Sequence, residues 1–235
     1  VKNIERKSKY IIFDFDNDFY TILHLGMSGT LHIPTNKKIS NLSFYSNPIL
    51  PKKHNHIIIN FKKFKLIYND PRRFGYFKIL NNKQDFEDYF KRIGPEALDK
   101  KFNVNYLKKK IINRKKNIKN FLLDQKIVSG IGNIYANEIL FKSQISPMKS
   151  VKVLSQIDLD KIIQFSRSTL RNAIKFGGSS IKDFKGISGS GGTFQKKFNV
   201  YDRENQKCKN NKCKGIIQKM YISNRSTYIC NFCQK

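Results

Sequence analysis

The chain has 235 residues, with 46 Lys or Arg against 17 Asp or Glu, so its formal net charge is +29. The length allows one large domain or two small ones. The absence of a run of about 18 apolar residues argues against a transmembrane helix, and the basic start does not resemble a secretory signal. A charge surplus of this size predicts a polyanionic partner, most commonly nucleic acid. AT-rich codon drift also favours Lys, Asn and Ile, so charge alone leaves that second explanation open.

The first third of the chain predicts short β-strands, because runs rich in Ile, Phe and Tyr alternate with turn residues. A polar loop with prolines, 34–53, divides the runs into two groups, which favours a pair of packed sheets. The predicted strands are Lys9–Asp16, Phe19–Leu25, Gly29–Ile33, His56–Phe61, Phe64–Asn69 and Tyr76–Leu80.

From residue 84 the apolar residues recur at spacings of three and four, which predicts helices. Gly94-Pro95 interrupts this pattern and marks a candidate domain boundary. The dense glycines of 186–192 predict a mobile loop. The helices are expected at Gln84–Arg92, Val104–Ile112, Ile118–Leu123, Ile134–Phe141 and Leu159–Phe176.

All four cysteines lie in the last 28 residues, in two pairs that enclose four and two residues and stand sixteen residues apart. Short pairs at this separation predict a zinc ribbon in which four thiolates hold one structural ion. Between them, Ile216–Ile222 and Ser226–Ile229 alternate as a β-hairpin, with Asn224-Arg225 at the turn. Arg225 is either presented to a ligand or an ordinary solvated turn residue. The ligands are Cys208, Cys213, Cys230 and Cys233.

Two glycine-bounded turns of the β-region carry an apolar side chain. The turn 70–75 places Phe74 after two arginines, and the turn 25–29 carries Met27. Arg can neutralise phosphate or fill an emptied base position, while an apolar side chain can wedge between base steps. The alternative is that Phe74 folds back over the sheet edge.

His54 and His56 precede a predicted strand without an accompanying carboxylate cluster, so at least one of them is predicted to contact DNA. The alternative is an ordinary surface histidine. Further along, Gly130-Ile131-Gly132-Asn133 leads into a helix, and Asn133 suits its N-cap. A helix N-terminus beside Arg114 and Lys119 predicts a phosphate site; a plain glycine turn is the alternative.

Taken in order, these segments closely resemble the formamidopyrimidine-DNA glycosylase family over most of the chain, from about Lys9 to Lys235. The segment 177–201 resembles that branch more than the related endonuclease VIII branch. The matching segments are 24–29, 70–75, 132–136, 182–184, Tyr201 and 224–227 within the cysteine module.

The resemblance implies an α+β protein with an antiparallel β-sandwich (1–93), a helix–two-turns–helix domain (94–206) and a zinc-finger hairpin (207–235). It implies a cytoplasmic, nucleoid-associated monomer that binds damaged double-stranded DNA and carries one structural Zn²⁺. The activity implied is removal of oxidised purines such as 8-oxoguanine, with β,δ-elimination at the abasic site. Catalytic roles fall on Lys9 and Arg225. DNA contacts fall on His54, Arg72, Arg114, Lys119 and Asn133, and base-stack filling on Met27, Arg72 and Phe74. The glycine loop 186–192 matches the segment that closes over the lesion.

The family pattern begins with a proline nucleophile followed by glutamate, whereas this chain begins Val1-Lys2-Asn3-Ile4-Glu5. We expect the sequence to be a fragment of a complete enzyme. The alternatives are a truncated, catalytically inactive protein that binds damaged DNA, a glycosylase for oxidised pyrimidines of the endonuclease VIII type, and a general architectural protein.

Overall fold

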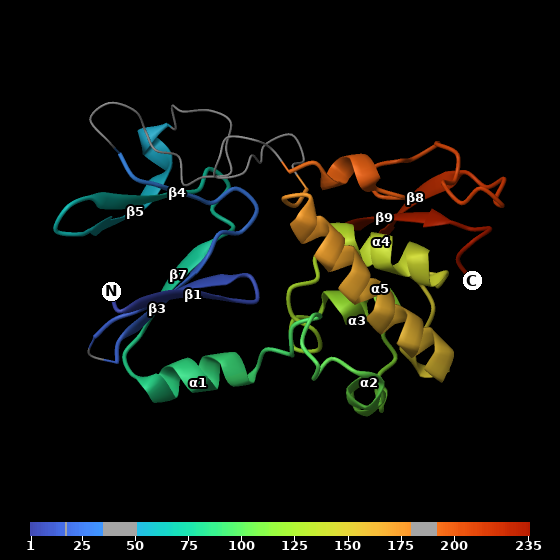
Figure 1. Ribbon diagram of the computed structural model, residues 1–235, viewed down its shortest axis with the longest axis horizontal. Coiled ribbons are helices and arrows are strands. Elements are labelled where there is room, and N and C mark those ends of the chain that lie inside the picture. The colour runs from blue at the N-terminus through green and yellow to red at the C-terminus, as the bar shows by residue number, and fades with distance from the viewer. Residues whose placement is uncertain (17, 35–50, 180–191) are drawn as a thin grey trace. The chain divides into compact units, whose positions relative to one another are not determined.

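A computed structural model describes residues 1–16, 18–34, 51–179 and 192–235 of the chain (Figure 1). The chain forms two compact units. The first comprises 1–90 and 176–195, and the second comprises 91–175 and 196–235. No helix of the described residues is long and apolar enough to cross a membrane.

The first unit contains two antiparallel sheets. One has the strand order β1-β2-β3-β7 and the other β4-β6-β5. The helix α1 (Lys83–Lys91) follows the last strand. The strands of the first sheet are β1 (Asn3–Lys7), β2 (Tyr10–Asp14), β3 (Tyr20–His24) and β7 (Tyr76–Leu80), and those of the second are β4 (Thr30–His32), β5 (Asn55–Asn60) and β6 (Lys65–Asn69).

Side chains from both sheets form one core in this unit. Phe13 and Leu23 come from the first sheet, and Leu66 and Tyr68 come from the second. Alternate residues of a strand point to opposite faces, and in β2 and β3 consecutive residues are buried, so both faces of these strands are covered. The predicted antiparallel β-sandwich is confirmed.

The second unit is built on helices α2 (Val104–Ile111), α3 (Ile118–Leu123), α4 (Asn133–Ser143) and α5 (Gln156–Lys175). The side chains of Asn103 and Asn117 accept hydrogen bonds from the first turns of α2 and α3, as N-caps do. Phe121 and Ile139 are completely buried in the core that these helices share. Short 3₁₀ segments occur at Lys52–His54, Val151–Val153 and Phe194–Lys197.

The hairpin of β8 (Ile217–Ile222) and β9 (Arg225–Cys230) belongs to this second unit (Figure 1). It packs on α4 through a small core that contains Phe141, Val200 and Tyr228. The buried carboxylate of Glu138 on α4 accepts hydrogen bonds from the backbone N–H groups of Asn199, Val200 and Tyr201, and so fixes the chain that leads into the hairpin.

The structure differs from the sequence-based expectations in four places. Strand β1 was not predicted, and all five of its side chains are exposed, so it lacks the buried alternation that identifies a strand. The N-cap of α4 is Gly132, and Asn133 is the first helical residue. The hairpin turn is Ser223-Asn224, both with positive φ as a type I′ turn requires, so that Arg225 begins β9. The cysteine hairpin belongs to the same unit as the helices, whereas the predicted boundaries make 207–235 a separate domain. Residues 176–195 belong to the first unit, whereas the predicted boundaries place them in the helical domain.

The loop 180–191 and most of the polar loop 34–53 lie outside the described residues. The predicted lesion loop 186–192 and the segment 182–184 therefore remain predictions, with Gly192 alone described.

Candidate nucleic-acid interface and metal centre

The two turns of the first unit that carry Met27 and Phe74, 25–29 and 70–75, are in direct backbone contact. The loop after β3 has Gly26 at φ +64°, and a Cβ placed there would lie 2.4 Å from the backbone nitrogen of Gly75. Only glycine allows both this left-handed conformation and so close an approach. The sequence separates these turns by over 40 residues, and the fold brings them together.

Asp70 fixes the pair of turns from inside. Its buried carboxylate accepts hydrogen bonds from the Ser28 hydroxyl, from the Tyr68 hydroxyl at 2.9 Å and from the Gly75 N–H at 2.8 Å. The Ser28 hydroxyl in turn accepts from the Arg72 N–H at 3.1 Å. Burial by itself would raise the pKa of the Asp70 carboxyl, but these donors outweigh it and hold the pKa below its usual value.

The side chains on the two turns face solvent. Met27 is 57% exposed and Phe74 is 55% exposed. The Arg72 guanidinium carbon lies 4.6 Å from the centroid of the Phe74 ring, within cation–π range. Phe74 therefore does not fold back into the sheet, and the structure places all three predicted stack-filling residues on one braced pair of turns.

The two histidines flank the same turns. The backbone carbonyl of His54 accepts from the Asp70 N–H at 3.0 Å, and His56 Nε2 donates to the Asp70 carbonyl at 2.9 Å. These two contacts attach the segment of His54 and His56 to the start of the turn 70–75.

Lys9 lies on the turn between β1 and β2, with an exposed side chain. The nearby His24, at the end of β3, accepts a hydrogen bond at Nδ1 from the Gly26 N–H at 3.0 Å. Burial and the charge of Lys9 together lower the pKa of His24. Both effects favour the neutral form of the His24 imidazole.

In the second unit, Lys119 of α3 is completely buried. Its Nζ donates to the Ser226 carbonyl at 2.9 Å and to Thr227 Oγ1 at 2.6 Å, both on β9. Burial, and secondarily the charge of Arg225, lowers the pKa of Lys119 to about 8. A direct contact between Lys119 and phosphate stays a prediction, and it would require the ammonium to leave these two acceptors.

Three asparagines complete the attachment of the hairpin to the helices. Asn133 Nδ2 donates to the Ser226 carbonyl at 3.0 Å. Asn137 Oδ1 accepts from the Tyr228 N–H at 2.8 Å, and Asn120 Nδ2 donates to the hydroxyl in the hairpin turn at 2.8 Å. Arg225 itself is exposed at the start of the strand that these contacts hold. Lys119, Asn133 and Arg225 thus form one cluster on the second unit.

Arg114 lies in the turn that follows α2, half-buried. Burial alone would raise the pKa of the nearby Asp124 carboxyl, but hydrogen bonds and the charges of Lys116 and Arg114 lower it. The charge of Arg114 also partly offsets the rise in pKa that burial causes in Tyr106. These neighbours place Arg114 beside α2 and α3, and neither of them belongs to the hairpin. The DNA contact of Arg114 stays a prediction.

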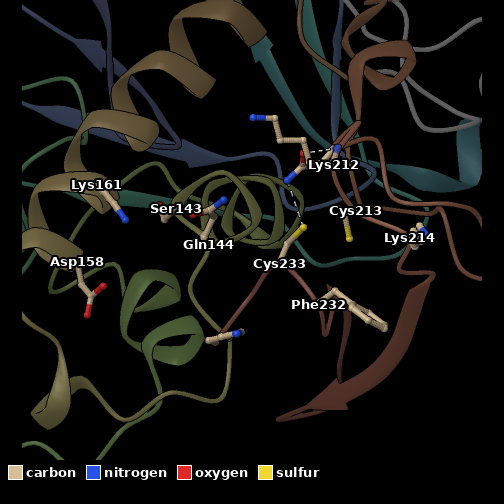
Figure 2. A pocket seen from close by; sticks show the side chains of 11 residues that line it. Ser143, Gln144, Asp158, Lys161, Lys212, Cys213, Lys214, Phe232 and Cys233 are labelled. Atoms are coloured by element: carbon tan, nitrogen blue, oxygen red, sulfur yellow. Dashed lines mark hydrogen bonds between the residues drawn. The ribbon is translucent and has the colours of Figure 1, made fainter.

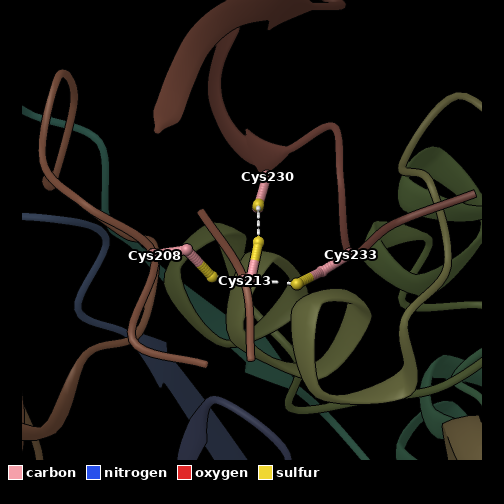
Figure 3. A group of neighbouring side chains, drawn as sticks. All are labelled: Cys208, Cys213, Cys230 and Cys233. Atoms are coloured by element: carbon pink, nitrogen blue, oxygen red, sulfur yellow. Dashed lines mark hydrogen bonds between the residues drawn. The ribbon is translucent and has the colours of Figure 1, made fainter. Parts of the chain in front are cut away.

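The four cysteine sulfurs converge at the base of the hairpin (Figure 3). All lie within 4.8 Å of one another, with 3.8 Å between Cys208 and Cys233 and 3.6 Å between Cys213 and Cys230. Four thiolates on one tetrahedral metal, with bonds of about 2.3 Å, stand about 3.8 Å apart. The donor set can therefore hold a metal ion, and it leaves no coordination position open.

Comparison with known proteins gives two family matches. Residues 1–77 match the formamidopyrimidine-DNA glycosylase N-terminal domain, and residues 93–185 match the formamidopyrimidine-DNA glycosylase H2TH domain. The chain belongs to the formamidopyrimidine-DNA glycosylase family. Similar relatives carry that name in Wolbachia pipientis wMel, at 40% identity over 100% of this chain and 82% of theirs, and in Rickettsia felis, at 39% over 100% and 80%.

Solved members of the family share the fold. A Lactococcus lactis Fpg in complex with DNA containing an abasic site has a TM-score of 0.84 and 32% identity. A MutM in complex with DNA containing carbocyclic 8-oxo-G has a TM-score of 0.85 and 33% identity. Each comparison covers 100% of this chain and 82% of the solved chain. The predicted family and the base-excision repair glycosylase class are confirmed.

Sequence reasoning missed the residues that support the site. Asp70 was read as part of a turn and Asn137 as part of a helix, and neither was given a role. Polar residues in buried positions are a usable signal, because a buried polar group needs a partner. The identity of that partner, however, depends on contacts between segments far apart in the sequence.

Replacing Asp70 with Asn tests the bracing of the first unit. The variant leaves donors without their charged acceptor, so at pH 7 its free energy of unfolding should fall by about 3 kcal/mol. The folded pKa is below the unfolded one, so the carboxylate stabilises the fold above the usual pKa and ceases to do so as pH falls through the folded value. Denaturant titrations should therefore show the gap between the two proteins narrowing at acid pH. An equally large gap at all pH values, or the same loss in the exposed control Asp88→Asn, would contradict the assignment.

Replacing Lys119 with Met tests the buried ammonium. The unfolded chain keeps this proton to about pH 10.4, whereas the folded pKa is about 8. Between these values the unfolded state binds more protons, so the contribution of Lys119 to stability rises with pH, by about 2 kcal/mol near pH 10. Unfolding experiments from pH 7.5 to 10 should show this rise in the native protein and in the exposed control Lys126→Met, and lose it in Lys119→Met. Identical pH profiles for all three proteins would refute the buried charge.

Proposed function

We propose that this protein is a DNA glycosylase and abasic-site lyase that binds damaged double-stranded DNA and removes oxidised purines such as 8-oxoguanine and formamidopyrimidines. The observation that carries the proposal is the pair of braced turns that exposes Met27, Arg72 and Phe74. Bases that leave a duplex stack leave a gap of apolar faces and unpaired edges. Two apolar side chains and a guanidinium are suited to occupy such a gap.

The cations of the two units have separate proposed roles. Arg225 grips a phosphate during the final elimination, and the contacts of Lys119 and Asn133 with β9 hold it in place. His54, Arg72 and Arg114 contact the DNA strands. Lys9, exposed and charged beside His24, serves the lyase chemistry. In that chemistry the amine of the family's proline nucleophile, which is not among the residues of this sequence, displaces the base from C1′ and forms a Schiff base. Loss of a C2′ proton then expels the 3′ phosphate, and a second elimination expels the 5′ phosphate, so that the strand is nicked.

The metal proposed for the four cysteines is one structural zinc ion. The sulfur separations of 3.6 and 3.8 Å support it, because they match a tetrahedral zinc–thiolate centre. Such an ion would supply no chemistry to the reaction. Its proposed work is to hold the base of the hairpin whose other end carries Arg225.

Reduction with borohydride tests the glycosylase and lyase proposal. In a chain that carries the family's proline nucleophile, a Schiff base with a duplex containing 8-oxoguanine opposite cytosine should be reduced to a stable protein–DNA adduct, visible as a shifted band under denaturing conditions. An undamaged duplex of the same sequence serves as the control. Tight, damage-selective binding without any adduct would instead support the damaged-DNA-binding alternative. An adduct formed only with oxidised pyrimidines would favour the endonuclease VIII type, and equal binding of damaged and intact duplex would favour an architectural protein.

Substitution of Cys230 by Ser tests the zinc proposal. Cys230 is completely buried and is one of the four converging sulfurs, so the substitution leaves three thiol ligands. The native protein should contain one zinc ion per chain, and the variant should contain much less. Its affinity for an abasic-site duplex should fall at least about tenfold, because metal-linked folding energy is lost from the hairpin. A variant that retains its zinc and its native affinity would contradict the proposal that Cys230 binds a structural zinc ion.

A further inference from the structure

A pocket of about 630 Å³ opens at the base of the cysteine hairpin, within the second unit (Figure 2). Its walls come from the end of α4, from α5, and from the two loops that carry the cysteines, and Cys213 and Cys233 line it. This volume lies in the range of pockets that take a small molecule or a few side chains. None of the residues proposed to contact DNA lines the pocket.

The lining is strongly basic. Lys161 on α5 and Lys212 and Lys214 on the loop of Cys213 line the pocket, and among the described residues none of the three has a carboxylate partner. The one acidic residue of the lining, Asp158, is already paired with Lys149 at 3.1 Å. The pocket therefore presents an uncompensated positive charge.

An exposed aromatic ring lies at the same pocket. Phe232, between two zinc-type ligands in sequence, is 70% exposed. Its ring packs against Gly215, where an added Cβ would lie 2.8 Å from Cδ2 of Phe232. In Figure 2 the ring of Phe232 and the side chain of Lys214 project from neighbouring parts of the cysteine module. The exposed ring therefore adds an apolar contact surface beside the basic lining of the pocket.

The pocket lies at the opposite end of the hairpin from Arg225. It adjoins Cys233, while Arg225 begins β9 and Cys230 ends it. Five residue steps along a strand span about 17 Å. A ligand of this pocket can therefore occupy it while Arg225 contacts another molecule.

We propose that this pocket is a docking site for an acidic peptide segment of another protein. Carboxylates of the segment pair with Lys161, Lys212 and Lys214, and an apolar side chain packs on Phe232. A DNA backbone would also satisfy the lysines; the peptide is preferred because one segment supplies both carboxylates for the lysines and an apolar side chain for the exposed ring. The proposal does not depend on the glycosylase activity, and it adds a protein partner to a module otherwise assigned to DNA.

The test uses the zinc-loaded chain and a fluorescent peptide of eight residues, in which three acidic residues flank a Phe-Leu pair on each side. Anisotropy should report a Kd below about 100 μM. The same peptide with Ser-Ser at its centre should bind at least about fivefold more weakly. Lys161→Glu should weaken binding about tenfold, since it turns an attraction into a repulsion. Lys175→Glu makes the same charge change on α5 outside the pocket, so it should alter the Kd by less than about twofold.

Two further arms separate this site from general attraction to a basic protein. Phe232→Ser, with its zinc content measured, should lose the preference for the Phe-Leu peptide over the Ser-Ser peptide. A saturating abasic-site duplex should leave peptide binding unchanged. Displacement of the peptide by the duplex would show that the pocket binds DNA instead. A Kd above about 1 mM, equal effects of Lys161→Glu and Lys175→Glu, or equal binding of the two peptides would each overturn the proposal.

Discussion

The exposed groups of this protein depend on buried polar contacts directly beneath them. Arg225 lies in solvent on β9, which is attached to α3 and α4 by the buried ammonium of Lys119 and by amide groups such as that of Asn133. Phe74 and Met27 lie on turns that the buried carboxylate of Asp70 fastens together. Buried polar groups are costly unless every partner is in place. They therefore hold the exposed side chains in one arrangement.

This constraint gives the hairpin two attachments with different chemistry. At its base, four cysteine sulfurs converge within 4.8 Å, and near its turn Lys119 and Asn133 donate hydrogen bonds to the Ser226 carbonyl of β9. The Lys119 ammonium is buried, and this burial lowers its pKa to about 8. The neighbouring charge of Arg225 adds to that shift, so the two cations are electrostatically linked although only one of them is exposed. A hairpin held at both ends can present Arg225 without a large core of its own.

Much of the fold could be predicted because local patterns are strong. Apolar and aromatic runs between turn residues predicted six strands, three- and four-residue spacing predicted the helices, and cysteine spacing predicted the four sulfurs that converge. The errors follow from missing local signals. β1 is exposed along its whole length, so no alternation marks it. The turn at Ser223-Asn224 lacks a glycine, so Arg225 was assigned to the turn although it begins β9. The contacts of Lys119 could not be predicted from the sequence. A basic residue near a helix terminus suggests a phosphate site, whereas the hydrogen-bond acceptors of Lys119 lie 107 and 108 residues further along the chain. The support from Asp70 is hidden for the same reason.

The central proposal is that the turns carrying Met27 and Phe74 and the hairpin carrying Arg225 each contact damaged duplex DNA. Hydrogen–deuterium exchange of the protein with and without a duplex containing an abasic site tests it most directly, since each segment is read separately in one experiment. The account predicts slower exchange at 25–29, 70–75 and 223–227 in the presence of this duplex, and a smaller effect with intact DNA of the same sequence. Protection of the hairpin with no change at either turn, or equal protection by intact and abasic duplex, would contradict the account.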